Sequence, residues 1–152
     1  MIKVTKAETG DEKGIYELLV NIFGGSGDYY KIRWTKQAEK CVTKWITLVG
    51  KDKKEVIGFL ACRQLKDGVT AYIEWFGVLE KYRSLGIGSQ MMKRLIRGLT
   101  DLGFKRIRVR AGNWEEHSDG AWRRISFRET GAVRFYRLHG FRRKKGWMSR
   151  KL

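Results

Sequence analysis

The sequence predicts one α/β or α+β domain in which helices pack against a single sheet. Segments of alternating apolar and polar residues, typical of strands, are interspersed with segments whose apolar residues recur at helical spacing. The chain has 152 residues, the length of one ordinary domain, and contains no internal repeat or linker-like tract. Apolar residues make up 42% of the sequence, which suffices for a core. We therefore expect residues 1–152 to form a single domain.

The N-terminal part of the chain predicts a strand and two helices. Residues 2–7 alternate between apolar and polar and predict a strand. Asp11 is a candidate N-cap of a helix that ends before the glycine-rich residues 24–27. A second helix is expected from after Thr35 to about Trp45. The apolar face of the first helix contains Ile15, Leu18, Leu19 and Ile22.

Three strands are expected next, at about residues 45–50, 55–65 and 70–79. The dipeptide Asp67-Gly68 lies between the last two, and it is typical of a hairpin turn because it tolerates positive φ angles. These strands therefore form the middle of the predicted sheet.

The remaining elements start with the helix that has the clearest periodicity, which Gly103 ends. Its apolar stripe consists of Ile87, Met91, Met92, Leu95, Leu99 and Leu102. A strand is expected at 105–111, and an irregular basic segment at 113–130. A short helix at about 131–139 and one or two basic strands at 141–152 complete the chain.

Charge and cysteine content limit the classes of protein. The net charge is +17, and residues 77–152 carry 20 Lys and Arg against six acids. Such a surface attracts polyanions and repels cations. No apolar run is long enough to cross a membrane, and the N-terminus lacks the apolar stretch of a signal peptide. Cys41 and Cys62 fit no metal-binding spacing, so we expect no metal, packing roles for both thiols and a cytoplasmic location.

A turn between the strand ending at Val78 and the longest helix predicts an anion site. Glycines let the backbone approach a ligand closely, and the first amides of a helix have no partner within the helix. Together with the helix dipole they suit a diphosphate, and an arginine adds further donors. A Rossmann loop is excluded because Met91 replaces its third small residue, and a Walker loop because Gly-Lys-Ser/Thr is absent. The segment consists of Arg83, Ser84, Leu85, Gly86, Ile87, Gly88 and Ser89.

Two motifs resemble the GNAT superfamily of N-acetyltransferases. Arg83-x-x-Gly86-x-Gly88, following a strand that ends in Val78, resembles the coenzyme A diphosphate loop of that superfamily. Residues 132–141 are similar to its second signature, which is a small residue, an aromatic-Tyr pair and then Gly-Phe. The motifs occur in the right order with a helix and a strand between them, and the resemblance covers about residues 70–141.

The resemblance implies a single mixed, mostly antiparallel central sheet flanked by helices, with acetyl-CoA as the acyl donor. It implies a kinked strand near Phe76-Gly77 that pairs with the pantetheine arm, where the N–H of Phe76 or Val78 supports the thioester oxygen. The superfamily usually has Asn three residues before the Ala of the second signature, where this chain has Glu129. Asn113 follows the preceding strand instead and is the candidate cofactor contact, so we interpret 113–130 as an insertion.

Two residues are candidate catalytic groups. An amine with a pKa of about 10 must lose a proton before it attacks a thioester. Glu74 lies mid-strand among apolar residues, in a segment similar to that of polyamine acetyltransferases, and is a candidate general base acting through water. Tyr136 matches the superfamily's position for the acid that protonates the leaving thiolate. The alternatives are an exposed Glu74 paired with a lysine, and a Tyr136 that only packs. We expect His117 and His139 to be structural or surface residues.

The acceptor is expected to be an amine, and the sequence leaves open which kind of molecule contains it. In the superfamily, the segment between the first two helices often walls the acceptor site. Asp28 here can orient a cation, and aromatic rings can contact it or simply pack on the sheet. The rings belong to Tyr29, Tyr30 and Trp34. The positive charge favours a macromolecular acceptor, most simply a protein or peptide amine.

Other acceptors and partners also remain open. The alternatives are an amine linked to RNA, such as an aminoacyl-tRNA, and a polyamine or small amine. A nucleic acid or ribosome contact through the basic C-terminal half and a homodimer are candidate partners, and no membrane is expected. Arg106, Arg108 and Arg110 share one strand face in that half, which is either a nucleic-acid surface or a solvated one.

Overall fold

One seven-stranded mixed sheet forms the centre of the molecule. The computed structural model describes residues 1–110, 113–116, 122–126, 131–144 and 147–152, and for the strands 113–116 and 122–126 the backbone alone. The strand order is β1-β2-β3-β4-β5-β9-β8, in which only β4 and β5 pair in parallel. The predicted fold class is therefore confirmed. The strands are β1 (Ile2–Lys6), β2 (Ile46–Asp52), β3 (Glu55–Gln64), β4 (Thr70–Val78), β5 (Arg106–Val109), β8 (Arg142–Lys144) and β9 (Trp147–Lys151).

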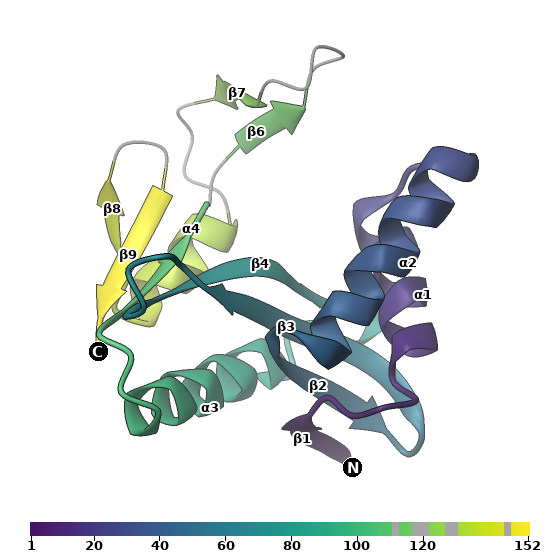
Figure 1. Cartoon of the computed structure of the whole chain (residues 1–152), viewed down its shortest axis with the longest axis horizontal. Helices are drawn as coiled ribbons and strands as arrows, with labels where there is room; N and C mark the ends of the chain where they lie inside the picture. Colours follow the sequence, from purple (N-terminus) through teal and green to yellow (C-terminus); the bar gives the residue numbers. More distant parts are fainter. Residues whose placement is uncertain (111–112, 117–121, 127–130, 145–146) are drawn as a thin grey trace.

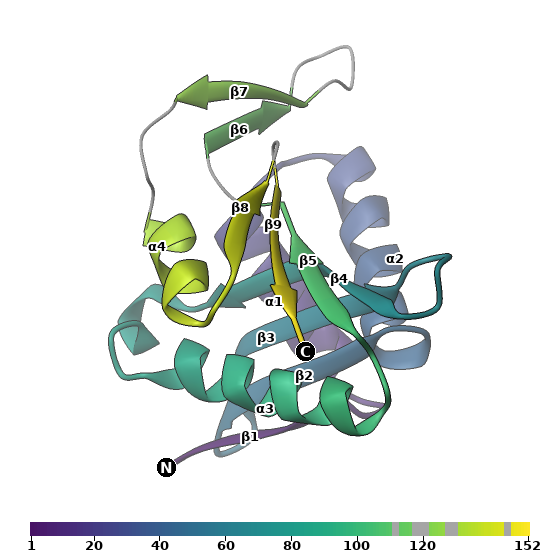
Figure 2. The ribbon, with the colours of Figure 1, turned by 90° about the vertical axis from the view of Figure 1, so that its left-hand side faces the viewer.

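Helices lie on both faces of the sheet, but they cover different strands on each face (Figures 1 and 2). On one face, α1 (Glu12–Phe23) and α2 (Asp28–Thr43) pack on β2, β3 and β4. On the other face lie α3 (Ile87–Asp101) and α4 (Gly131–Leu138), and a short 3₁₀ turn, η1 (Glu80–Tyr82), precedes α3. β6 (Asn113–Glu116) and β7 (Trp122–Ser126) form a separate two-stranded sheet, so the expectation of an irregular segment there is wrong for these strands.

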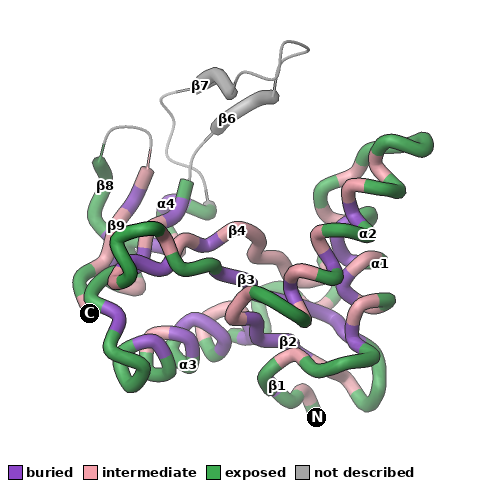
Figure 3. Tube along the Cα trace, in the orientation of Figure 1, coloured by how far each residue is buried: buried purple, intermediate pink, exposed green. Residues whose placement is uncertain are grey.

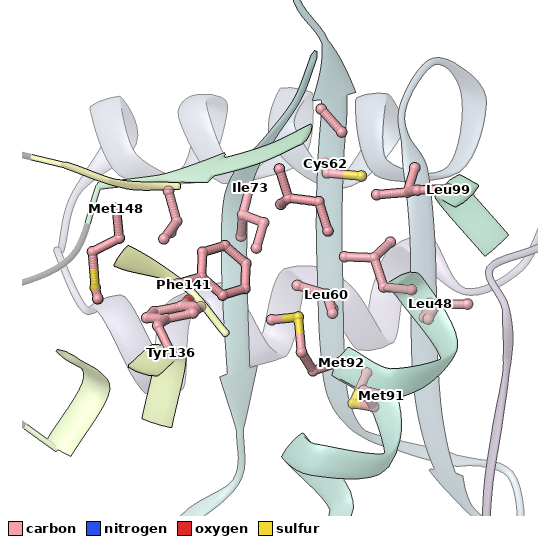
Figure 4. Packing of buried hydrophobic residues seen from close by; sticks show 14 of the residues in the cluster. Leu48, Leu60, Cys62, Ile73, Met91, Met92, Leu99, Tyr136, Phe141 and Met148 are labelled. Carbon is pink, nitrogen blue, oxygen red and sulfur yellow. The ribbon is translucent and has the colours of Figure 1, made fainter. Parts of the chain in front are cut away.

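Two apolar clusters form the core, one on each side of the sheet (Figure 3). The larger cluster joins α3 and α4 to the sheet, as Figure 4 shows for Met91, Met92, Leu60 and Tyr136. The apolar stripe predicted for α3 is confirmed, since five of its residues are buried; Leu102, which is 67% exposed, lies beyond the last turn.

The smaller cluster joins α1 and α2 to β2 and β3. Cys41 lies in this cluster and Cys62 in the larger one, so the two thiols occupy opposite faces of the sheet. Both are buried and free, and burial raises the pKa of each to about 12. Thiols in this state are poor nucleophiles and poor metal ligands, as the packing interpretation expects.

Two local features of the N-terminal half differ from expectation. Asp11 is the N-cap residue of α1, as predicted, but its side chain makes no cap hydrogen bond; its carboxylate accepts the N–H of Glu8 at 2.9 Å and pairs with Lys51 at 2.8 Å. The second helix begins at Asp28, eight residues before the expected start after Thr35. Gly27, with φ 86°, ends the loop, and burial of Trp34 in the smaller cluster outweighs the modest helix propensity of the aromatic residues around it.

The parallel pair β4–β5 separates after a few residues, and this gap positions the site. Thr70 to Ile73 pair with Arg106 to Val109, whereas β4 continues alone on that side to Val78. A β-bulge accompanies the split, because Cys62 opposes Ile73 while Ala61 opposes Trp75, which leaves Glu74 as the extra residue. The kink expected near Phe76-Gly77 therefore lies two residues earlier.

Candidate active site

A cavity of about 680 Å³ opens where β4 leaves β5, between the end of β4, the start of α3 and α4. It brings together the glycine turn of the first motif with the small residue and the aromatic-Tyr pair of the second, but not with the Gly-Phe pair that ends the second motif. Its lining residues are Ile22, Phe76, Gly77, Val78, Tyr82, Arg83, Ser84, Gly86, Ile87, Gly88, Ser89, Ala132, Phe135 and Tyr136.

The turn before α3 supplies free backbone donors to this cavity. Gly86 has φ 79° and precedes the helix, whose first internal hydrogen bond runs from the N–H of Gln90 to the carbonyl of Gly86 at 3.0 Å. The amides of Ile87, Gly88 and Ser89 therefore have no partner within the helix, and no side chain caps Gly86. Three free amides at the positive end of a helix dipole form a site for a diphosphate.

Conformation explains the residue types in this turn. The positive φ of Gly86 is strained for any residue with a Cβ, and Ser84 also has a positive φ, of 66°. A Cβ on Gly88 would lie 3.5 Å from Phe76, which is ordinary contact, so the packing of the protein alone does not demand glycine there. Arg83 donates from Nε to the carbonyl of Val78 at 2.9 Å, which ties the turn to the end of β4.

The unpaired edge of β4 presents two further amides. Leu79 donates its N–H to the carbonyl of Ile57 at 2.9 Å, on the β3 side. Because amide directions alternate along a strand, the N–H of Gly77 also points to β3, whereas those of Phe76 and Val78 point to the opposite edge. Among the residues that the structure describes, that edge has no strand partner beyond Ile73, so both amides are available to a ligand.

Tyr136 approaches the cavity from α4 and is buried among aromatic rings. Its ring centroid lies 5.2 Å from that of Phe141 and 5.5 Å from that of Phe135. Burial raises the pKa of Tyr136 well above its ordinary value, and the nearby Tyr72 adds to this. The phenol is therefore protonated at neutral pH and is a proton donor.

Glu74 does not line the cavity. Its carboxylate pairs with the guanidinium of Arg63 on the neighbouring strand β3. The alternative expectation was an exposed Glu74 paired with a lysine. Glu74 does form an ion pair, but its partner is an arginine. The side chain of Glu74 is 23% exposed, so solvent still reaches the carboxylate.

The candidate acceptor residues divide into two groups. Asp28, Tyr30 and Trp34 line a second cavity of about 300 Å³ at the start of α2, whereas Tyr29 is 66% exposed and does not line it. Trp34 is also a core residue: its indole N–H donates to the carbonyl of Gly24 at 2.9 Å, and its ring meets that of Trp75 edge-on at 5.2 Å.

For two candidate cofactor-binding residues, one in the loop and one in the insertion, the structure describes no side chain in the main cavity. The side chain of Leu85 is 66% exposed and does not line the main cavity, so only its backbone belongs to the turn. Asn113 begins β6, and its side chain lies outside the described residues.

Sequence reasoning missed one polar contact of the loop. His139, expected to be structural, lies 3.1 Å by Nε2 from the hydroxyl of Ser89, and its ring packs on Phe135 with centroids 4.6 Å apart. Burial, with Lys93 and Arg150 nearby, lowers the pKa of His139 and keeps the ring neutral at neutral pH. His139 lies in the turn directly after α4, three residues beyond Tyr136, and this spacing was the available signal.

Two classes of site find no support in the described part of the chain. No group of three or more His, Cys, Asp or Glu side chains there is placed to hold a metal ion. None of the described helices has the length and apolar character needed to cross a membrane.

The model of the Acetyltransferase (GNAT) family matches residues 13–141 of the chain. Solved structures with the same fold include the PaiA N-acetyltransferase from Thermoplasma acidophilum in complex with coenzyme A, with a TM-score of 0.68, 14% identity and coverage of 100% of this chain and 99% of that one. The ribosomal-protein-S18-alanine N-acetyltransferase from Escherichia coli has a TM-score of 0.70 at 14% identity, with coverage of 99% and 94%.

An aminoglycoside 6'-N-acetyltransferase complexed with coenzyme A has a TM-score of 0.76 at 14% identity, with coverage of 98% and 96%. No curated protein matches the chain significantly by sequence. At such low identities the structural matches show the fold, whereas the family model shows the relationship.

Proposed function

Because this chain belongs to the GNAT family of acetyltransferases, and so uses acetyl-CoA, we propose that it transfers the acetyl group to a primary amine of a protein or peptide. The observation that carries the proposal is that one cavity is lined both by the glycine turn at the start of α3 and by the protonated phenol of Tyr136. The glycine turn suits the diphosphate of acetyl-CoA, and the phenol suits the sulfur atom of coenzyme A as it leaves.

The residues present fit acetyl-CoA. The amides of Ile87, Gly88 and Ser89 and the guanidinium of Arg83 are proposed to hold the diphosphate, with Ser84 and the backbone of Leu85 and Gly86 completing the turn. The free edge of β4 would receive the pantetheine arm, since the amides of Phe76 and Val78 point to that side. The contribution of Asn113 remains part of this proposal on sequence grounds alone.

The proposed chemistry is direct attack in a ternary complex. The amine nitrogen forms a bond to the thioester carbonyl carbon, and the N–H of Phe76 or Val78 stabilises the developing oxyanion. Collapse breaks the carbon–sulfur bond. Tyr136 donates its phenolic proton to the thiolate that leaves, so coenzyme A departs as the free thiol.

Glu74 is proposed to accept the proton that the amine loses, through a bridging water. The carboxylate lies on β4 beside the strand edge of the cavity but does not line it, so a direct contact is not expected. Arg63 fixes its orientation through the ion pair. A general base can act on an amine through one bridging water, and this is the role proposed for the carboxylate.

The acceptor class rests on charge and on the second cavity. A free polyamine is a cation and is repelled by a chain of net charge +17, unless Asp28 and the rings of Tyr30 and Trp34 attract it locally. Tyr29, exposed beside this cavity, is a further candidate contact. A peptide with acidic residues near its free amine suits both features, because the acidic residues are attracted by the positive charge of the protein and the amine can bind at the second cavity.

Acetylation of an acceptor panel tests this proposal. The panel contains peptides with free N-termini, N-blocked peptides with one lysine, spermidine and an aminoacyl-tRNA, each incubated with acetyl-CoA. We expect acetylated peptide by mass spectrometry, with matching release of free coenzyme A. Modification of spermidine or of aminoacyl-tRNA alone would replace the peptide acceptor by the corresponding alternative.

A further inference from the structure

The end of the sheet formed by β5, β9 and β8 has one face that none of the described helices covers. Ile107, Val109 and Met148 point to the α3 side and are buried in the larger cluster. Alternation along the strands turns Arg106 and Arg108 to the opposite face. On that opposite face α1 and α2 cover β2, β3 and β4, at the other end of the sheet (Figures 1 and 2).

This uncovered face is hollowed and strongly basic. A cavity of about 670 Å³ lies on it, and no acidic residue is among its lining residues. Strand register explains the clustering, because Arg106 opposes Lys151, and Arg108 and Arg142 both oppose Ser149. The basic lining residues are Arg106, Arg108, Arg142, Lys144, Arg150 and Lys151.

Several donors in this cavity lack acceptors. The guanidinium of Arg108 lies over the ring of Trp147, 3.5 Å from the centroid. The Nε atom of Arg108 is buried and has no hydrogen-bond partner among the described residues. Arg150 points to the α4 side, as Met148 does, and lies beside Gly140, so its Nε is not a donor of this face. Arg106 has only a marginal ion pair, 4.0 Å from Asp67, with both side chains nearly half exposed. Buried donors without acceptors are costly, so this face suits a ligand that carries acceptor oxygens.

We propose that this basic face, defined by Arg106, Arg108, Arg142, Lys144, Trp147 and Lys151, binds single-stranded nucleic acid. Guanidinium and ammonium groups on three adjacent strands, which are about 4.8 Å apart, can follow a chain of phosphates. The guanidinium of Arg108 stacks on the ring of Trp147, and this ring supplies an aromatic surface on which a base can stack. A second copy of this chain is disfavoured as the occupant because it would bring two basic faces together.

The proposal does not depend on the acetyl acceptor. The face lies on β5, β8 and β9, and none of its residues lines the main cavity. Arg63 opposes Tyr72, and Tyr72 opposes Arg108, so one row of residues connects this face with the ion pair of Glu74.

Fluorescence anisotropy over a range of salt concentrations tests the proposal. The probes are unstructured RNA and DNA oligonucleotides of about 15 nucleotides, within the site sizes of single-strand-binding folds, and a polyglutamate peptide of matched charge. The face variant carries Arg142→Gln, Lys144→Gln and Lys151→Gln, all exposed side chains. The charge-matched control carries Lys3→Gln, Lys36→Gln and Lys54→Gln, which are also exposed but lie on β1, α2 and the β2–β3 turn.

We expect the face variant to reduce the slope of log affinity against log salt by about 2, since each lost phosphate contact on a single strand removes about 0.7. The control should reduce it by less than about 1. Trp147→Leu should weaken binding by about five- to a hundredfold without changing the slope. Relative affinities for the two oligonucleotides then distinguish RNA from DNA as the natural ligand.

Three results would overturn the proposal. The face variant and the control could weaken binding equally, which would show only an effect of net charge. Polyglutamate could bind as tightly as the oligonucleotides, which would assign the face to an acidic protein. Trp147→Leu could leave binding unchanged, which would remove the base platform. Circular dichroism of each variant checks that it is folded, and acetyl transfer measured separately shows that the enzyme remains active.

Discussion

Tyr136 shows how burial at a single residue keeps a phenol in its protonated form. The pKa of its phenol is raised from an ordinary value of 10.0, mainly by burial. The side chain therefore stays protonated throughout the range in which acceptor amines lose their protons. The sequence motif predicted this residue and its role, and the structure places the phenol in the lining of the main cavity.

Replacing Tyr136 by phenylalanine should lower kcat by about ten- to a thousandfold, because the leaving thiolate loses its proton donor. The affinity for coenzyme A, measured by calorimetry, should be nearly unchanged. In the unmodified enzyme kcat should not fall between about pH 7 and 9, since a raised pKa keeps the phenol protonated there. A Tyr136→Phe enzyme with normal turnover would remove the residue from the mechanism.

Glu74→Gln should lower kcat by about ten- to a hundredfold at pH 7, because the carboxylate that takes the proton from the protonated amine is lost. Activity should recover as pH rises towards the pKa of the amine, about 10, where free base forms unaided. Arg63→Gln breaks the same ion pair and serves as the control. Equal losses in both variants, without recovery at high pH, would mean that the pair only supports the strand.

The sequence predicted the local part of the site better than the part that depends on pairing between strands. The residues of the turn and Tyr136 come together because each belongs to a short motif with its own local conformation. The ion pair of Glu74 depends on the register of β3 against β4, which no short pattern reveals. The contact between His139 and Ser89 likewise joins residues far apart in the sequence.

At the scale of elements, two helical glycines differ in what surrounds them. A Cβ on Gly14 in α1 would lie 2.8 Å from the Cβ of Val56 on β3, whereas one on Gly98 in α3 would meet nothing within 4 Å. Val56 is β-branched and stiff, so α1 cannot gain a methyl group there without moving from the sheet. The same substitution therefore has opposite effects in the two helices.

Gly98→Ala should stabilise the protein by about 0.5 to 1 kcal/mol, because alanine is the better helix former. Gly14→Ala should destabilise it by about 1 to 3 kcal/mol, because the clash outweighs the same gain in propensity. Denaturant unfolding of both variants measures the two free energies. Equal effects of the two substitutions would contradict the close packing of α1 on β3.

Element types were predictable from periodicity, whereas some boundaries were not. The stripe of α3 and the alternation of β3 and β4 were strong enough to give the right elements. The start of α2 was not, because the burial of Trp34 against Trp75 is a tertiary effect. The start of α1 after Asp11 was predictable, but the bonds of the Asp11 carboxylate to the preceding turn and to Lys51 on β2 were not.

At the scale of the whole molecule, the order of strands explains the position of both proposed sites. β4 and β5 are parallel neighbours that separate, which opens the catalytic cavity, while β9 and β8 extend the sheet beyond the cover of α1 and α2. The sequence indicated one sheet with helices but contains no local signal for this order. The excess of positive charge in residues 77–152 has a structural counterpart in the basic face of β5, β8 and β9.

A crystal structure of the protein with coenzyme A tests the central claim most directly. We expect the diphosphate oxygens about 2.7 to 3.2 Å from the main-chain nitrogens at the start of α3, and the thiol beside Tyr136. A diphosphate bound on the basic face, or anywhere other than the turn between Arg83 and Ser89, would contradict the account.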